Sequence, residues 1–117
     1  MYEDHPVCFN AKDLGTSSAY DIRKYAYLDL FAGAFGHTYG CHDVWQMYDS
    51  TRVGINGPHF SWKIALDLPG ANQMKFAREL MESKSMLDRI PDQSILIESD
   101  ETPGERIQAT SGKDYVF

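Results

Sequence analysis

The stretch Ser18–Thr38, SAYDIRKYAYLDLFAGAFGHT, joins a predicted helix to a predicted strand and decides the fold class. Ser18 and Asp21 have the spacing of a capping box, and a broad apolar face follows them as far as a glycine at position 33. We therefore predict a helix over residues 19–32. The next six residues, GAFGHT, show the alternation of side-chain types that is typical of a strand. Their glycines let neighbouring backbones approach closely, so we predict a short buried strand at 33–38.

The flanking sequence repeats this alternation of strand and helix. Residues 1–8 are typical of a strand end and are followed by a polar stretch, predicted to be a loop, up to Gly15. Apolar residues at helical spacing predict a second helix over 71–83. The order strand, helix, strand, helix favours parallel α/β units.

The pattern changes near residue 92. Residues 94–99 and 106–111 are predicted to be strands separated by a turn at 100–105. We therefore divide the chain into an α/β part, 1–92, and the start of a β-rich domain, 93–117. Two βα units cannot close a sheet, and both chain ends have strand character, so we expect the chain to be a fragment of a larger protein.

Composition excludes several classes of function. The 117 residues are 43% hydrophobic, which allows a modest core, and carry a net charge of −6. The negative charge and the absence of any Lys/Arg run argue against a nucleic-acid partner. No window approaches the roughly 18 apolar residues of a membrane span. Two cysteines, Cys8 and Cys41, leave free thiols, one disulfide or part of a metal site open.

The stretch AFGHTYGCHDVWQMY, residues 34–48, is the candidate ligand site. Its flat and polar side chains are those of His37, Tyr39, His42, Trp45 and Tyr48. In parallel α/β folds ligands bind at the carboxyl ends of strands, where this stretch is predicted to lie. Aromatic faces with scattered hydrogen-bonding groups suit a sugar ring. The alternative is that the aromatic residues belong to the core or a subunit contact and the histidines are loop residues with local partners.

Two other chemistries receive less support. His37, Cys41 and His42 could supply three zinc ligands, with Cys8 or His5 as a fourth, but their spacing matches no common zinc-binding pattern, so no metal or other cofactor is expected. Neither cysteine lies on a recognisable nucleophile elbow. Three aspartates are expected to cap turns or face solvent: Asp43, Asp49 and Asp67.

Three stretches resemble the apiosidase-like glycoside hydrolases of bacteria: AGAFGHTYGCHDVWQMY, ALDLPGANQMKFARELMES and RIPDQSILIES. The resemblance runs through nearly the whole chain, and its GHTYG…W element is the most specific part. It implies a (β/α)8 barrel (TIM barrel) followed by a small β-sandwich. Residues 1–5 would end barrel strand seven, 19–32 would be helix seven, 35–40 strand eight and 71–83 helix eight.

The resemblance also implies roles for individual residues. His37, Tyr39, Trp45 and His42 would line a sugar-binding floor at the end of strand eight, with the tryptophan stacked on the sugar ring. Glycoside hydrolysis uses two carboxyl groups. Glu3 is the candidate nucleophile at the end of strand seven, although similar sequences carry an earlier glutamate, in a Gly-Glu-Pro-x-Tyr-Glu run, that is absent here. The alternative for Glu3 is a rim carboxylate paired with a base.

The sequence therefore predicts part of a glycosidase that acts on plant-type polysaccharides. The expected partners are a carbohydrate substrate and the N-terminal part of the barrel, which would supply the acid at the end of strand four. The alternative is a non-catalytic carbohydrate-binding or structural module. The intact protein is expected in the periplasm or at the surface of a bacterium, and the chain alone is expected to be inactive.

Overall fold

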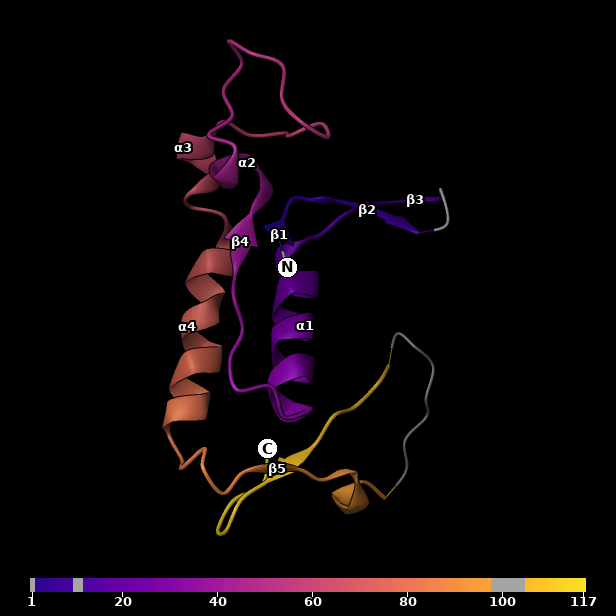
Figure 1. The fold of residues 1–117 in the computed structure, drawn as a ribbon, viewed down its shortest axis with the longest axis vertical. Coiled ribbons are helices and arrows are strands. Elements are labelled where there is room, and N and C mark those ends of the chain that lie inside the picture. The colour runs from indigo at the N-terminus through magenta and orange to yellow at the C-terminus, as the bar shows by residue number, and fades with distance from the viewer. Residues whose placement is uncertain (1, 10–11, 98–104) are drawn as a thin grey trace. The chain divides into compact units, whose positions relative to one another are not determined.

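The computed structural model describes residues 2–9, 12–97 and 105–117 of a mixed α/β chain (Figure 1). The chain forms two compact units. We call Met1–Tyr25 together with Thr38–Lys75 the first unit, and Ala26–His37 together with Phe76–Phe117 the second unit. The predicted domain boundary at residue 92 stays a prediction.

The first unit contains the parallel strand pair that the sequence predicted. Strand β1, Tyr2–Glu3, pairs in parallel with β4, Gly40–Cys41, in the register Tyr2↔Gly40 and Glu3↔Cys41. Helix α1, Ala19–Phe31, lies between the two strands in the chain, so β1, α1 and β4 have the order of a βαβ connection (Figure 1). A Cβ at Gly40 would lie 2.4 Å from the ring of Tyr2, so this glycine permits the close approach of the two strands.

The prediction of a loop up to Gly15 was wrong. Strand β2, Pro6–Phe9, pairs antiparallel with β3, Lys12–Thr16, and the register shifts between Pro6 and Cys8. The mostly polar sequence of β3 carries no alternating apolar signal, and the strand is recognised in the structure by its backbone pairing with β2.

Both ends of α1 agree with the sequence. The Asp21 carboxylate accepts hydrogen bonds from the backbone N–H of Ser18 at 2.9 Å and from its hydroxyl at 2.7 Å, and Ser18 Oγ accepts from the Asp21 N–H at 3.4 Å. This is the predicted capping box. At the other end Gly33 has φ 101°, a left-handed conformation that favours glycine, and the N–H of Ala34 donates to the carbonyl of Asp29 at 3.0 Å.

Replacing Ser18 with alanine is expected to lower the free energy of unfolding by about 1 kcal/mol at pH 7. The hydrogen bonds from Ser18 lower the pKa of Asp21 below its ordinary value of 3.8. A depressed carboxyl pKa stabilises the folded state above the unfolded pKa, and this contribution is lost as pH falls through the folded value. Urea unfolding should therefore give a smaller penalty for Ser18→Ala at pH 3 than at pH 7, and an equal penalty at both would contradict the capping role.

The predicted buried strand at residues 33–38 was wrong. No strand is assigned between α1 and Gly40, and the Phe35 side chain is 92% exposed. Of the six residues proposed for barrel strand eight, 35–40, only Gly40 belongs to β4. A strand forms where a partner backbone lies beside it, and the two residues of β1 pair only with Gly40 and Cys41.

Three α-helices follow β4 in the described part of the chain. Helix α2, His42–Trp45, begins directly after the strand, and α3, Trp62–Ala65, follows the loop that comes after α2. Helix α4, Pro69–Glu82, confirms the helix predicted at 71–83 and begins with a proline at its first position.

The second unit ends in short strands. Strand β5, Ile90–Pro91, pairs antiparallel with β6, Thr110–Ser111, and a bridge joins Ser111 to Val116. The predicted strand at 94–99 was wrong where the structure describes it, because Gln93–Ile95 forms a 3-10 helix, η1, capped by Asp92, whose side chain accepts a hydrogen bond from the N–H of Ser94. Most of the predicted turn at 100–105 lies outside the described residues.

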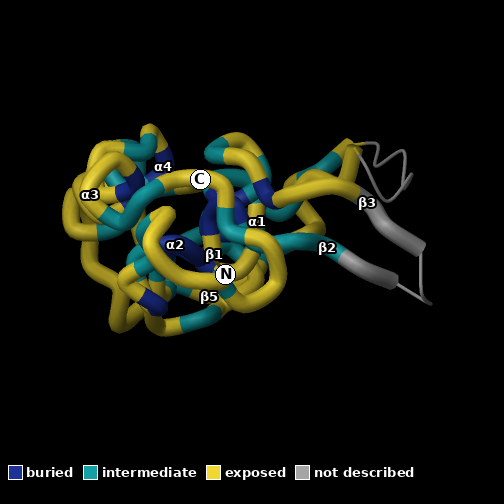
Figure 2. The backbone as a smooth tube through the Cα atoms, turned by 90° about the horizontal axis from the view of Figure 1, so that it is seen from above, coloured by how far each residue is buried: buried dark blue, intermediate teal, exposed yellow. Residues whose placement is uncertain are grey.

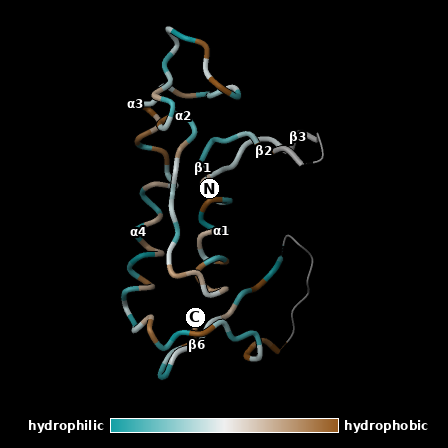
Figure 3. Tube along the Cα trace, viewed as in Figure 1, coloured by the Kyte–Doolittle hydropathy of each residue, from teal (hydrophilic) through white to brown (hydrophobic). Residues whose placement is uncertain are grey.

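Few of the described apolar residues are buried, and many large ones are exposed. Figure 2 colours each described residue by its burial and Figure 3 by its hydropathy. The buried apolar residues are Ile22, Ala26, Leu30, Cys41, Ala65, Ala77 and Ala109. Val53, Leu87 and Ile97 are each at least 95% exposed. Among the helices in the described residues, none combines the length and apolar character that a membrane span needs.

Candidate functional site

Residues within or next to β1 and β4, together with His59 from a later loop, form a polar cluster in the first unit. Because the two strands are parallel and in register, their carboxyl ends meet at one edge. We call the residues gathered around this edge the strand-end cluster: Glu3, Asp4, Tyr39, His42, Asp43, Trp45 and His59. Three of its members, Glu3, His42 and Asp43, are almost fully buried.

Glu3 is held by two donors. Its side chain accepts hydrogen bonds from the Tyr39 hydroxyl at 2.7 Å and from the backbone N–H of Gly70 at 3.2 Å. Gly70 lies in the first turn of α4, and a Cβ there would come within 2.2 Å of the Glu3 carboxylate. Burial, followed by the hydrogen bond to Glu3, raises the pKa of Tyr39, so its hydroxyl keeps its proton and remains a donor. Glu3 therefore links β1, Tyr39 and the N-terminus of α4.

Asp43 anchors the loop before α3. Its Oδ1 accepts hydrogen bonds from the backbone N–H groups of His59 at 3.0 Å and Phe60 at 3.1 Å. Its Oδ2 lies 3.8 Å from the Sγ of Cys41, whose thiol pKa is raised by burial. The expectation that Asp43 caps a turn or faces solvent was wrong on exposure, since the residue is fully buried.

Asp4 holds the imidazole of His59. The two carboxylate oxygens of Asp4 each lie 2.9 Å from His59 Nδ1. Asp4 itself has φ 56°, which is uncommon for a residue with a side chain, and its N–H donates to the carbonyl of Ser17 at 2.8 Å. The His59 side chain is 53% exposed, whereas that of Asp4 is 12% exposed.

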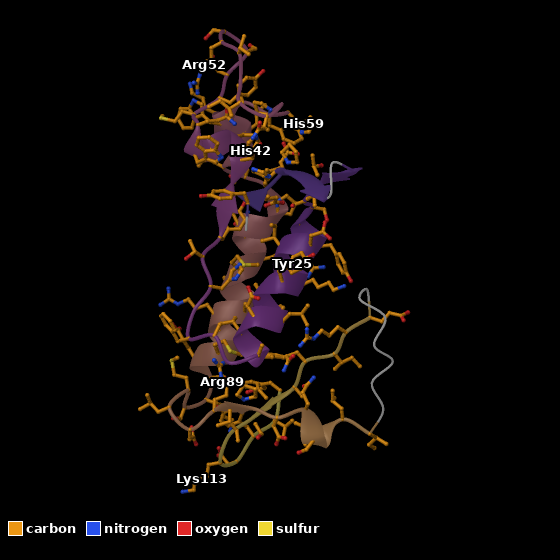
Figure 4. The ribbon with its side chains drawn as sticks, turned by 45° about the vertical axis from the view of Figure 1, so that its right-hand side comes forward. Tyr25, His42, Arg52, His59, Arg89 and Lys113 are labelled. Atoms are coloured by element: carbon orange, nitrogen blue, oxygen red, sulfur yellow. The ribbon has the colours of Figure 1, made fainter. Side chains whose placement is uncertain are left out.

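His42 orients Trp45. The indole N–H of Trp45 donates to His42 Nδ1 at 3.2 Å, and His42 Nε2 lies 2.9 Å from the carbonyl of Ile55. These contacts assign the proton to Nε2, because a nitrogen that accepts from an indole must be unprotonated. The ring of His5 packs edge-on against His42 at 4.7 Å between centroids. Figure 4 shows His42 and His59 near the same end of the first unit, with Arg52 on the chain segment that joins them.

The predicted floor residues differ in their surroundings. Trp45 is 49% exposed and Tyr39 is half-buried, so both retain accessible ring surface. His42 has no exposed surface with which to contact a ligand. His37 belongs to the second unit, where its Nδ1 lies 3.3 Å from Asp29 Oδ2 and its Nε2 is buried without a partner in the described part of the chain.

No metal site appears among the residues that the structure describes. No group of three or more His, Cys, Asp or Glu side chains there is arranged to hold an ion. The side chain of Cys8, one of the donors considered from the sequence, lies outside the described part.

Comparison with known proteins identifies the family. The family described as "Apiosidase-like, catalytic domain" matches residues 1–88. The chain belongs to the apiosidase-like family. A search of curated proteins finds no match.

Two solved structures extend the comparison of this apiosidase-like chain. One, described as a glycoside hydrolase, is 38% identical with a TM-score of 0.89. The other, a family 5 glycoside hydrolase from Bacteroides vulgatus, is 35% identical with a TM-score of 0.85. In each case 99% of this chain is covered but only 26% of the other, so the chain spans about a quarter of the length of these structures. Their similarity relates it to glycosidases in general.

Sequence reasoning missed three residues of the cluster: Asp4, Asp43 and His59. Asp43 had one available signal, its place immediately after the Cys-His pair that follows a predicted strand. The partners of Asp4 and Asp43 lie 55 and 16 residues away, in a loop with no regular pattern.

Proposed function

We propose that the chain forms part of the sugar-binding end of a glycoside hydrolase, with Trp45 and Tyr39 on the ligand-facing surface. The observation that carries this proposal is the half-exposed indole of Trp45, whose N–H is held by fully buried His42 just after β4. An indole fixed at its polar edge with open ring surface is suited to stack on a sugar, which is apolar on its faces. His42 then acts by orienting Trp45 rather than by touching the sugar. The role of His37 as a sugar contact stays a prediction from the resemblance.

A barrel completed by other chain segments is the proposed context. The small core and the fully exposed apolar residues are what a part of a larger domain presents before the rest covers it. Residues 1–92 would belong to a (β/α)8 barrel and 93–117 to the following β-rich domain. The remaining barrel units would supply the second carboxyl group that hydrolysis needs. The intact enzyme would act on plant-type polysaccharide side chains in the periplasm or at the surface of a bacterium.

We propose a positioning role for Glu3. A side chain that is 4% exposed and accepts from both Tyr39 and Gly70 is suited to hold the tyrosine and α4 in place. The nucleophile role inferred from resemblance stays a prediction, and it requires the carboxylate to reach the anomeric carbon of a bound sugar.

Sugar binding tests the proposed function. Titration of the chain with aryl glycosides and pectic oligosaccharides should quench Trp45 fluorescence in a Trp62→Phe background, where Trp45 is the sole tryptophan. Trp45→Ala should weaken the affinity for these saccharides at least about tenfold, the scale of a buried aromatic contact. Binding by this variant is measured by NMR, because Trp45 fluorescence is lost. Trp62→Phe alone is the matched control and should bind like the unmodified chain. Equal affinities for Trp45→Ala and the control would exclude stacking of the Trp45 indole on the sugar.

The chain alone should hydrolyse none of these compounds above background. Two carboxyl groups must flank the scissile bond, and the proposal places at least one of them in other segments of the barrel. Hydrolysis should be followed with soluble, folded protein so that misfolding does not imitate inactivity. Turnover that disappears in Glu3→Gln would instead give Glu3 the nucleophile role and place a complete site within these residues.

A further inference from the structure

The contacts of His59 go beyond those of a solvated loop residue. Its backbone is fixed by Asp43, which accepts the N–H of His59 at 3.0 Å and that of Phe60 at 3.1 Å. Its ring is fixed by Asp4, with both carboxylate oxygens 2.9 Å from Nδ1. A loop side chain held at both backbone and ring has little freedom left, although 53% of its surface is exposed.

The anchoring residues are themselves constrained. Asp43 is fully buried directly after β4. Asp4 follows β1 with φ 56° and is held there by the hydrogen bond from its N–H to Ser17. A residue with a side chain adopts this conformation at an energetic cost, which the surrounding contacts must offset. Both parallel strands therefore contribute the aspartate at their carboxyl end to the placement of one imidazole.

The contact with Asp4 determines what the free side of the ring presents. Because Asp4 accepts from Nδ1, the proton of the neutral imidazole resides on Nδ1 and the lone pair on Nε2. Among the described residues none hydrogen-bonds Nε2. Nε2 of this half-exposed side chain is thus an oriented acceptor, suited to a hydroxyl group that donates to it.

We propose that His59 is a substrate-positioning residue whose Nε2 accepts a hydrogen bond from a sugar hydroxyl, with Asp4 setting the tautomer. The proposal rests on the proposed function, since it takes the ligand to be a saccharide bound at the strand-end cluster. It adds a polar contact to the stacking surface of Trp45. A hydrogen bond from one sugar hydroxyl to this oriented acceptor favours sugars that carry a hydroxyl at that ring position over sugars that lack it.

Two substitutions separate the two sides of the ring. His59→Asn keeps an N–H donor near the place of Nδ1 and removes the group at Nε2, so it preserves the contact with Asp4. His59→Gln places an amide near Nε2 and gives up the contact with Asp4. If His59 serves only to pair with Asp4, His59→Asn should bind saccharides normally. On the present proposal it should weaken the Kd about fivefold, the scale of one hydrogen bond, while His59→Gln keeps part of the affinity.

The experiment measures saccharide Kd by NMR for the unmodified chain, both His59 variants, Trp45→Ala and Lys63→Gln, an exposed control nearby. Long-range ¹H–¹⁵N spectra of the histidines should give the Nδ1–H tautomer for His59, and Asp4→Gly, which removes the acceptor and tolerates a φ of 56°, should remove that preference. An unchanged thermal midpoint shows that a variant folds, and if His59→Asn unfolds, the tautomer spectrum and His59→Gln decide. An Nε2–H tautomer, or binding sensitive to Trp45→Ala but not to His59→Asn, overturns the role of His59 alone. Absence of any saccharide binding by the unmodified chain overturns the proposed function and the role of His59 with it.

Discussion

Replacing Asp43 with alanine should lower the free energy of unfolding by about 3 kcal/mol, because two backbone donors lose their acceptor inside the first unit. The N–H groups of His59 and Phe60 both donate to this fully buried side chain. Both hydrogen bonds are part-buried, and the loss of each hydrogen bond to a charged group costs about 1.5–3 kcal/mol. Urea unfolding followed by circular dichroism measures the loss.

Two further variants control the Asp43 experiment. Asp43→Asn keeps a carbonyl acceptor of the same shape and should cost clearly less than alanine. Asp67→Asn changes an exposed aspartate in the same unit and should stay within about 0.5 kcal/mol of the unmodified chain. A cost for Asp43→Ala no larger than that of Asp67→Asn would mean that the loop does not depend on Asp43.

Replacing Glu3 with alanine should cost about 2–3 kcal/mol. The Tyr39 hydroxyl and the Gly70 N–H would both lose their acceptor, and the space of a buried side chain would be left open. Glu3→Gln retains the shape and one carbonyl acceptor, so we expect a cost of about 1 kcal/mol.

The pH at which the Tyr39 phenol ionises gives a second test of the role of Glu3. In the unmodified chain, burial and the hydrogen bond to Glu3 raise the pKa of Tyr39, so its phenol should not ionise where exposed tyrosines do, near pH 10. Tyr39→Phe is the matched control, since it removes the hydroxyl and leaves Glu3 in place. Full stability of Glu3→Ala, with unchanged titration of Tyr39, would contradict the positioning role.

Local signals were sufficient for the helices. The boundaries of α1 depend on Ser18 and Asp21 at one end and Gly33 at the other, all within a few residues of the turns they cap. Helix α4 followed from apolar spacing along a single segment. Interactions of this range are encoded in neighbouring residues, so the sequence alone determined them.

Strand positions could not be placed in the same way. Residues 33–38 have the alternation and glycines of a strand, yet the strand forms at Gly40 and Cys41, where β1 offers a partner. Residues 12–16 lack an apolar pattern and form β3 because β2 lies opposite. A strand is stabilised by pairing with a strand that can be remote in sequence, and a local sequence pattern does not identify that partner.

The same distinction between local and long-range interactions applies to the candidate site. The residue types in GHTYG…W supplied the aromatic and imidazole groups of the candidate site, and they carried the resemblance to the apiosidase-like family, which the family match over residues 1–88 confirms. Only the tertiary structure decided which of these groups is accessible: Trp45 is half-exposed, while His42 is buried behind it. It also decided that Asp4 meets His59 across 55 residues and that Asp43 holds the loop across 16. The physical reason is that burial and long-range hydrogen bonds depend on the packing of distant segments, whereas capping and periodicity depend on neighbours along the chain.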